Sequence, residues 1–523
     1  MLEEIDKLRS QIQEIDSSIS QLAQRRLNLL QRLNDIQPAT SVLPAELLPV
    51  IFQFVCRHSS PLFEQENGSY LHISSNFKQA SWECPESTSS ALNLLQRVST
   101  CWRNSVLSAP ALWTKVNLSI DNIADAQRKA TILMNHLHRS KDLPLLLSLH
   151  YKRNLILASS DTLLHPSVDH RLRESIKRVE RLHLTYPPRS WLSESLACSQ
   201  KMLELSLMGA ERILLKNFGL MDRLGVSKLS INSCRTLELA SSTHITMLSL
   251  CHVPIDIFYT CLIECANLTQ VYFKSPWPEV SNSTATPPTT NFTIHHLQEL
   301  NWSIQDSSSG HVAVWQIALL SNVCLPSLRE LYCYHPSQFA TPEPLKNAII
   351  SFYARLPTSL KTLGLRNTPG YDYYGGAHSY LLQNLQQFPS DSRIEHIILN
   401  DCTYPVLFRI LLELRPDHSA ASFNFPNLRK VTIGTIFWVS GLGGTETLLQ
   451  ARTDAASALP PLVADLLERR LPHCIVLPKS FVLIFREEED TWWLTSVKQR
   501  LIHLKSRYNQ LKILAGSRPV DWL

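Results

Sequence analysis

The chain has 523 residues and a formal net charge of +5, with 44% hydrophobic and 18% charged residues. This length exceeds a single compact core, so we expect several domains or an elongated repeat array, and the composition excludes a wholly disordered chain. A net charge this small does not indicate the concentrated basic face of a nucleic-acid-binding protein, and we expect no nucleic-acid partner.

The N-terminal sequence MLEEIDKLRSQIQEI is rich in acids and helix formers and lacks the apolar core of a signal peptide. The densest apolar window, DLPLLLSLH, is too short to span a bilayer, so no membrane partner is expected. Without an export signal, the twelve cysteines are expected to be reduced and mostly buried. Together these features predict a cytoplasmic and/or nuclear protein.

Residues 1–37 are predicted to form an amphipathic helix. Apolar side chains recur at alternating spacings of three and four, at Ile5, Leu8, Ile12, Ile15, Ile19, Leu22, Leu29, Leu33 and Ile36. Arg26 interrupts this heptad stripe, and Pro38 ends it. One interpretation is a coiled coil through which the chain self-associates, and the other is a helix that stays alone or folds against its own protein. Four to five heptads lie near the minimum for a coiled coil, which slightly favours the second.

A second helix is predicted over Glu46–Val55, with Pro44 in its first turn. It carries more apolar side chains than one core face needs, namely Leu47, Leu48, Ile51, Phe52 and Val55. Surplus apolar surface on a short helix indicates contact with another chain.

The polar stretch Ser59–Ser90 is predicted to be a loop. Helical spacing then resumes, with one predicted face formed by Leu92, Leu95, Val98, Cys101 and Trp102. Ala109-Pro110 ends this helix, and the alternation of Val116, Leu118 and Ile120 predicts a strand.

The segments LPAELLPVIF and LLQRVSTCWRNSVLSAPALWTKV resemble the F-box motif of the large fungal F-box family. That family's pattern is Leu-Pro-x-Glu-(Leu/Ile)-Leu-x-x-Ile-Phe, a variable insert, Val-Cys-(Arg/Lys)-x-Trp-Arg, and Ala-x-x-x-Pro-x-Leu-Trp. The match covers residues 39–118. It departs from the pattern by the insert 59–90 and by a cysteine displaced to Cys101. The family also carries a helix that ends in Arg-Ser followed by Pro-Leu, which this chain matches at Arg139-Ser140 and Pro144-Leu145.

The resemblance implies a small all-α domain that binds the Skp-type adaptor subunit of a cullin–RING ubiquitin ligase. The residues it assigns to the adaptor interface are Leu43, Pro44, Leu47, Leu48, Ile51 and Phe52, with Val98 and Trp102 nearby. From the residues alone, the alternative is that these side chains form a small helical core. We favour the core for Leu95 and Cys101, and the interface for Leu43, Pro44 and Leu47.

From residue 179 onward a pattern of apolar, two positions, apolar, one position, apolar returns, and each copy predicts a strand. The copies are VERLHL (179–184), MLELSL (202–207), VSKLSI (226–231), ITMLSL (245–250), LTQVYF (268–273), LQELNW (297–302), LRELYC (328–333), LKTLGL (360–365), IEHIIL (394–399) and LRKVTI (428–433), with CRTLEL (234–239) as an extra. Helices are predicted between later copies, in IFYTCLIECA, WQIALLSNV and LKNAIISFYARL.

This arrangement resembles an irregular leucine-rich-repeat solenoid with a parallel concave sheet, and it implies an α/β fold over residues 119–523. Segment 275–294 is predicted to be a loop or a disordered insertion, and 441–447 a flexible turn. A final helix is predicted to cap the open end, with apolar Leu494, Val497, Leu501, Leu504, Tyr508 and Leu511.

No pattern indicates catalysis. Cys251, His252, Cys261 and Cys265 lack the spacing of a zinc site, and GLGGTET lacks the Gly-Lys-Ser/Thr ending of a phosphate-binding loop. The basic helix face of Lys498, Arg500, Lys505, Arg507 and Lys512 is predicted to be solvated. We therefore expect no enzyme, no cofactor and no metal.

The F-box resemblance implies a substrate-recognition adaptor of an SCF-type ubiquitin ligase, which docks on the Skp-type subunit and holds an unknown target protein through the repeats. The alternative is a repeat scaffold that binds partners outside any ubiquitin ligase and keeps a degenerate F-box.

Overall fold

The structure is a computed structural model of an α/β chain. The residues it describes are 2–36, 43–44, 46–58, 87–152, 170, 172, 174–187, 202–209, 212–214, 225–239, 241–274, 277, 286–303, 310–335, 342–367, 388, 393–400, 402–403, 407, 410–411, 414, 425, 427–434, 436–437, 461–469, 471, 482–485, 495–508, 511–515 and 518–519. The chain divides into two compact units, unit 1 (Met1–Gly209 and Arg223–Gly225) and unit 2 (Ala210–Asp222 and Val226–Leu523). The predicted domain boundary at residues 118–119 lies inside unit 1. Within the described ranges, no helix is long and apolar enough to cross a membrane.

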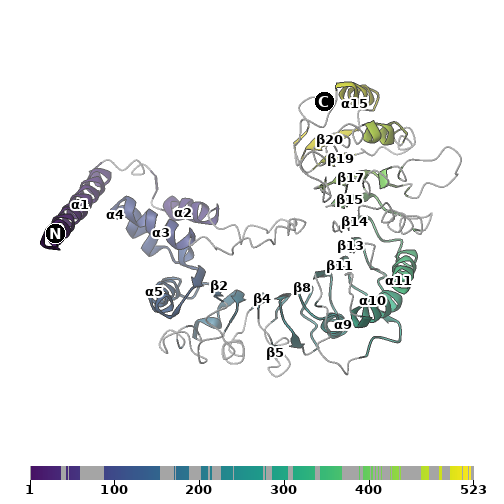
Figure 1. Cartoon of the computed structure of the whole chain (residues 1–523), viewed down its shortest axis with the longest axis horizontal. Coiled ribbons are helices and arrows are strands. Elements are labelled where there is room, and N and C mark those ends of the chain that lie inside the picture. Colours follow the sequence, from purple (N-terminus) through teal and green to yellow (C-terminus); the bar gives the residue numbers. More distant parts are fainter. Residues whose placement is uncertain are drawn as a thin grey trace. The chain divides into compact units, whose positions relative to one another are not determined.

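Unit 1 begins with a group of helices, four of which are labelled α1 to α4 in Figure 1. They are α1 (Leu2–Ile36), α2 (Leu47–His58), α3 (Ser87–Val98), α4 (Thr100–Ser108) and the 3₁₀ helix η2 (Pro110–Trp113). The predicted single helix over Leu92–Trp102 is wrong, because Ser99 adopts an extended conformation and its side chain accepts a hydrogen bond from the Trp102 backbone N–H, 3.2 Å away. The predicted loop Ser59–Ser90 ends earlier than expected, since α3 begins at Ser87; residues 59–86 lie outside the described residues.

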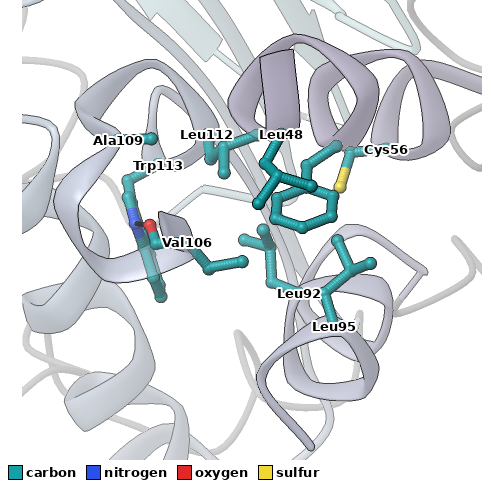
Figure 2. Packing of buried hydrophobic residues seen from close by; sticks show 9 residues of the cluster. Leu48, Cys56, Leu92, Leu95, Val106, Ala109, Leu112 and Trp113 are labelled. Atoms are coloured by element: carbon teal, nitrogen blue, oxygen red, sulfur yellow. Dashed lines mark hydrogen bonds between the residues drawn. The ribbon is translucent and has the colours of Figure 1, made fainter. Parts of the chain in front are cut away.

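Helices α2, α3, α4 and η2 converge on one apolar core (Figure 2). Its buried members are Leu48, Phe52, Cys56, Leu92, Leu95, Val106, Ala109, Leu112 and Trp113. The rings of Phe52 and Trp102 lie 4.9 Å apart between centroids. Leu95 is buried as predicted, whereas Cys101 is exposed, so the prediction that Cys101 is a core residue is wrong. The break at Ser99 explains this, because it starts a new helix on which Cys101 no longer shares the face of Leu95.

A parallel sheet completes unit 1. Its strands, in spatial order, are β1 (Lys115–Ile120), β2 (Leu145–Tyr151), β3 (Val179–Thr185) and β4 (Glu204–Met208). β1 buries alternate residues, Val116, Leu118 and Ile120, as the sequence predicts. Between β1 and β2 runs α5 (Ile123–Arg139), which begins where the Asn122 side chain accepts a hydrogen bond from the Asp125 N–H and ends before Ser140.

Unit 2 contains the rest of the repeated strands. In spatial order they are β6 (Lys228–Asn232), β8 (Met247–Cys251), β9 (Gln270–Lys274), β11 (Glu299–Ser303), β13 (Glu330–His335), β14 (Thr362–Asn367), β15 (His396–Asn400), β17 (Lys430–Ile433), β19 (Val482–Phe485), β20 (Lys512–Ala515) and β21 (Arg518–Pro519). Each of the ten predicted repeat segments overlaps a strand. The described strand pairs are parallel apart from β20–β21.

Three short pairs lie beside this sheet: β5 (Arg212–Leu214) with β7 (Thr236–Glu238), β10 (Phe292–Thr293) with β12 (Val323–Cys324), and β16 (Cys402–Thr403) with β18 (Ile436–Phe437). CRTLEL therefore forms a side strand rather than a repeat strand. The predicted loop 275–294 includes β10 near its end, and residues 441–447 lie outside the described residues.

Helices α9 (Ile255–Glu264), α10 (Gly310–Asn322) and α11 (Glu343–Ala354) lie on one side of the unit 2 sheet (Figure 1). Aromatic contacts attach them: Phe258 of α9 stacks on Phe273 of β9 with 4.0 Å between centroids. Trp302 of β11 meets Phe258 at 5.8 Å and Phe352 of α11 at 6.1 Å. Alternate strand residues therefore face the helices, and those between them face the opposite side.

The predicted C-terminal helix is present but shorter than expected. It is α15 (Thr495–Arg507), in which Val497, Leu501 and Leu504 are buried. The sequence predicts Tyr508 and Leu511 in this helix, but the helix ends at Arg507 and Leu511 directly precedes β20. Leu494 lies outside the described residues.

Candidate docking surface on helix α2

Helix α2 has two apolar faces. Leu48, Phe52 and Cys56 are four residues apart, so they share one side of the helix, and all three are buried in the core. The remaining apolar side chains of the helix are all exposed, with exposed fractions of 45% for Leu47, 58% for Val50, 41% for Ile51, 63% for Phe54 and 45% for Val55. At about 100° per residue these five cover one continuous side of the helix. A helix of this kind fills its own core and still presents apolar surface to solvent.

The chain that enters α2 extends this surface. Leu43 and Pro44 are exposed, and the Leu47 N–H donates to the Pro44 carbonyl oxygen, 2.9 Å away. We call the exposed side chains of Leu43, Leu47, Val50, Ile51, Phe54 and Val55 the α2 surface. Between Leu47 and Cys56 the helix contains no charged residue, so the α2 surface is uncharged and apolar along this stretch.

The eight residues predicted at the adaptor interface lie in three environments. Leu43, Pro44, Leu47 and Ile51 are exposed, Val98 and Trp102 are half-buried, and Leu48 and Phe52 are covered by the core of this chain. Leu48 and Phe52 are turned toward α3 and α4, where they hold α2 in place. Val50 and Phe54 were missed, although their spacing of three and seven from Leu47 is the helical signal that identifies them.

The core behind the α2 surface carries one titratable group. Burial raises the pKa of the Cys56 thiol, and nearby Lys115 opposes this rise. The thiol is therefore protonated at neutral pH and acts as a small apolar side chain.

Helix α1 presents a second apolar stripe. Along it, Leu8, Ile12, Ile15, Ile19, Leu22, Leu29 and Leu33 are exposed, each by more than half. The side chains of Ile5 and Ile36 lie outside the described residues. These seven side chains are therefore not packed against the chain's own protein, which excludes that interpretation for them. Self-association through α1 stays a prediction.

Cys251, Cys261 and Cys265 have surroundings that keep their thiols protonated. Burial raises the pKa of Cys261 well above its ordinary value, and burial with nearby Glu264 raises the pKa of Cys265 to about 12. Burial also raises the pKa of Cys251, against opposing effects of Lys274 and a backbone hydrogen bond from His252. In the part of the chain that the structure describes, no three His, Cys, Asp or Glu side chains converge to form a metal site.

None of the known protein-family models matches the chain, and no curated protein matches its sequence. The F-box resemblance therefore depends on the residues of this chain alone.

Proposed function

We propose that the chain is the substrate-recognition adaptor of an SCF-type cullin–RING ubiquitin ligase. Residues 39–118 would be its F-box, which docks on the Skp-type subunit through the α2 surface. The observation that carries this proposal is that α2 has two apolar faces. One face is buried in the core, and the five apolar side chains of the other face are exposed. In a cytoplasmic or nuclear protein, apolar surface of this kind is expected to be covered by a partner.

One departure from the family pattern is compatible with the F-box assignment. Ser99 occupies the position at which the family has cysteine. It is buried and caps α4 by accepting the Trp102 N–H, so the helix start that positions Trp102 is retained by another side chain.

The α2 surface is too small to hold a stable complex by itself. Burying the exposed halves of its five helical side chains contributes about 1 kcal/mol each. Association costs about 4–15 kcal/mol. The α2 surface therefore accounts for the centre of the interface, and a stable complex requires further contacts, for which exposed Leu43 and Pro44 are the nearest candidates.

We assign the repeated strands and helices to a leucine-rich-repeat-like region that binds the target protein. The assignment is supported by parallel strands in register and by α9, α10 and α11, which lie on one side of the sheet. The chain would supply no chemistry of its own. Its contribution is to hold a target lysine near the ligase's catalytic subunits, which raises their effective concentration.

The alternative is a repeat scaffold with a degenerate F-box. It is favoured by the long insert and by exposed Cys101, the two departures from the family pattern. This scaffold would bind its partners without the adaptor.

Recovery of the tagged chain from cells with the proteasome blocked separates these functions. A ligase subunit is expected to bring down the Skp-type adaptor, a cullin and ubiquitin-bearing targets. The double variant Leu47→Glu with Ile51→Glu should lose the adaptor and the cullin while keeping the targets. The matched control is Ile263→Glu, an equally exposed apolar residue on α9. Recovery of targets without any adaptor from the unmodified chain would support the scaffold instead.

A further inference from the structure

Four neighbouring strands of unit 2 present a set of polar and aromatic side chains on the side opposite the helices. The strands β9, β11, β13 and β14 are parallel and in register. Val271, Phe273, Leu300 and Trp302 face the helices, so the residues between them face away. We call this side of the four strands the open sheet face.

The side chains at the N-terminal ends of these strands are acidic. Glu299 and Glu330 are register partners on β11 and β13. Glu299 accepts hydrogen bonds from Gln270 Nε2 (3.1 Å) and the Tyr272 hydroxyl (2.6 Å), and Glu330 accepts one from the Tyr332 hydroxyl (2.8 Å). Burial raises the pKa of Glu299, the bond from Tyr272 lowers it, and neighbouring Glu330 raises it. Two carboxylates that repel one another would be stabilised by a cation.

The side chains at the C-terminal ends of the same strands are basic. The Nζ of Lys274 lies 5.4 Å from the ring centroid of Tyr334, and the Cζ of Arg366 lies 4.8 Å from it. Burial raises the pKa of Tyr334, but Lys274, Arg366 and hydrogen bonds from Arg366 and Asn301 together lower it below its ordinary value. Two cations held against one ring make this end of the face attractive to an anion.

Between the two charged ends lies an aromatic row. Tyr272 of β9, Asn301 of β11, Tyr332 of β13 and Gly364 of β14 are consecutive register partners. A methyl group on Gly364 would lie only 2.2 Å from Cδ1 of Tyr332, so the absence of a side chain there makes room for the tyrosine ring. The Oδ1 atom of Asn301 is buried and has no hydrogen-bond partner within the described residues.

We propose that the open sheet face binds an extended segment of the target protein that carries a basic side chain at the Glu299–Glu330 end and an acidic side chain at the Lys274–Arg366 end. The two ends are four residues apart along a strand, a span of about 13 Å. An extended segment with its two charges about four residues apart fits this span. Tyr272, Asn301 and Tyr332 between the two ends are buried, so the two tyrosines position Glu299 and Glu330 by hydrogen bonds and the charged ends make the contact. This inference deepens the proposed function, because the segment it describes belongs to the ligase target.

Charge favours a peptide over a nucleic acid. Tyrosines and nearby cations are also found where single-stranded nucleic acids bind. Glu299 and Glu330, however, occupy half of the charged positions on this face and would repel a phosphate backbone. Only a ligand with both signs of charge satisfies both ends.

The test is selection of a random-sequence heptapeptide display library on the immobilised full chain. Selected peptides are expected to contain a Lys or Arg and an Asp or Glu three to five positions apart. The best peptide is then titrated against the chain and the variant Lys274→Glu with Arg366→Glu, which should bind it at least about tenfold more weakly. A peptide whose acidic residue is replaced by lysine should recover binding to that variant. Lys430→Glu, on β17, is the matched control and should leave binding unchanged.

Three outcomes would overturn the proposal: selected peptides without the charge pair, equal binding to the charge-reversed variant, or displacement of the peptide by oligo-thymidine at equal concentration. Glu299→Gln provides a milder second variant and should weaken binding of the basic end alone. The charge-reversed variant should still bind the Skp-type adaptor. If it does while no peptide shows the charge pair, the inference fails and the proposed function stands.

Discussion

His136 lies edge-on against the indole of Trp113, with 4.9 Å between the ring centroids. Its Nδ1 atom is 3.3 Å from the Trp113 carbonyl oxygen, and Arg139 places its Cζ 4.5 Å from the same indole. Trp113 belongs to the core that holds α2, whereas His136 and Arg139 belong to α5 of the adjoining sheet. Trp113 thus connects the core that holds α2 to the helix that follows the first strand of the sheet.

Replacing Trp113 by phenylalanine is expected to lower the free energy of unfolding by about 1–3 kcal/mol beyond the loss of ring volume, because the Val106 carbonyl oxygen would lose its bond from Nε1 at 2.9 Å and stay buried. Urea denaturation measures this. The control is Trp302→Phe, since the Nε1 of Trp302 is buried without a hydrogen-bond partner. Equal losses for the two variants would contradict the role of the bond.

Acid is expected to destabilise the protein through two buried histidines. Burial lowers the pKa of His136 to about 4, and burial with nearby His183 lowers the pKa of His150 to about 4. The unfolded chain has the ordinary value near 6.5 and takes up protons first as the pH falls. Each histidine's contribution is therefore complete above pH 6.5 and lost by pH 4, a change of about 3 kcal/mol.

Unfolding free energies measured between pH 7 and pH 5, where carboxyl groups stay ionised, check this prediction. The His136→Gln variant should show a smaller loss over this range than the unmodified chain. A free energy that does not change with pH would show that these histidines are solvated.

The planar guanidinium of Arg178 donates several hydrogen bonds to the C-terminal end of α5 and the residues that follow it. It donates to the Leu137 carbonyl oxygen at 2.6 Å, to Ser140 Oγ at 3.0 Å, and to the carbonyl oxygens of Lys141 and Leu143. An ammonium group cannot reproduce this planar fork, so Arg178→Lys should lower the melting temperature by an amount equivalent to about 1.5–3 kcal/mol. Arg128→Lys, which changes an ion pair in which the basic side chain is exposed, should have an effect within about 1 kcal/mol. A similar shift in melting temperature for both variants would show that the hydrogen bonds of Arg178 contribute no more than the ion pair of Arg128.

Gly364 is expected to tolerate no side chain while Tyr332 is present. Gly364→Ala would push the tyrosine ring aside and break its bond to Glu330, so we expect weaker peptide binding on the open sheet face and a lower free energy of unfolding. A double-mutant cycle measures the coupling. In a Tyr332→Ala background, Gly364→Ala should not lower the free energy of unfolding further. Additive effects of the two substitutions would contradict the close approach of residue 364 to the Tyr332 ring.

The repeated strands could be predicted because each carries the same spacing of buried residues, and their residues alternate as a sheet requires. The break at Ser99 could not, since serine occurs inside helices as well as at their starts, and only the bond to Trp102 decides between them. The sequence pattern also could not predict that Leu48 and Phe52 are buried. When nearly every residue of a helix is apolar, periodicity does not identify the face that packs inward, and the position of α3 and α4 determines it.

The open sheet face was equally inaccessible from sequence. Glu299 and Glu330 are 31 positions apart, and only the register of the strands brings them together. Their spacing in sequence varies with the length of the helices between repeats, so no fixed motif marks them.

Direct binding of the purified full chain to the Skp-type adaptor subunit tests the central claim. Isothermal titration should detect a one-to-one complex. Leu43→Ala with Leu47→Ala should weaken it by about 30-fold or more, since two half-exposed leucines contribute about 2 kcal/mol on burial, whereas Ile502→Ala on α15 should leave it unchanged. An adaptor that binds the double variant as tightly as the unmodified chain, or neither of them, would contradict docking through α2.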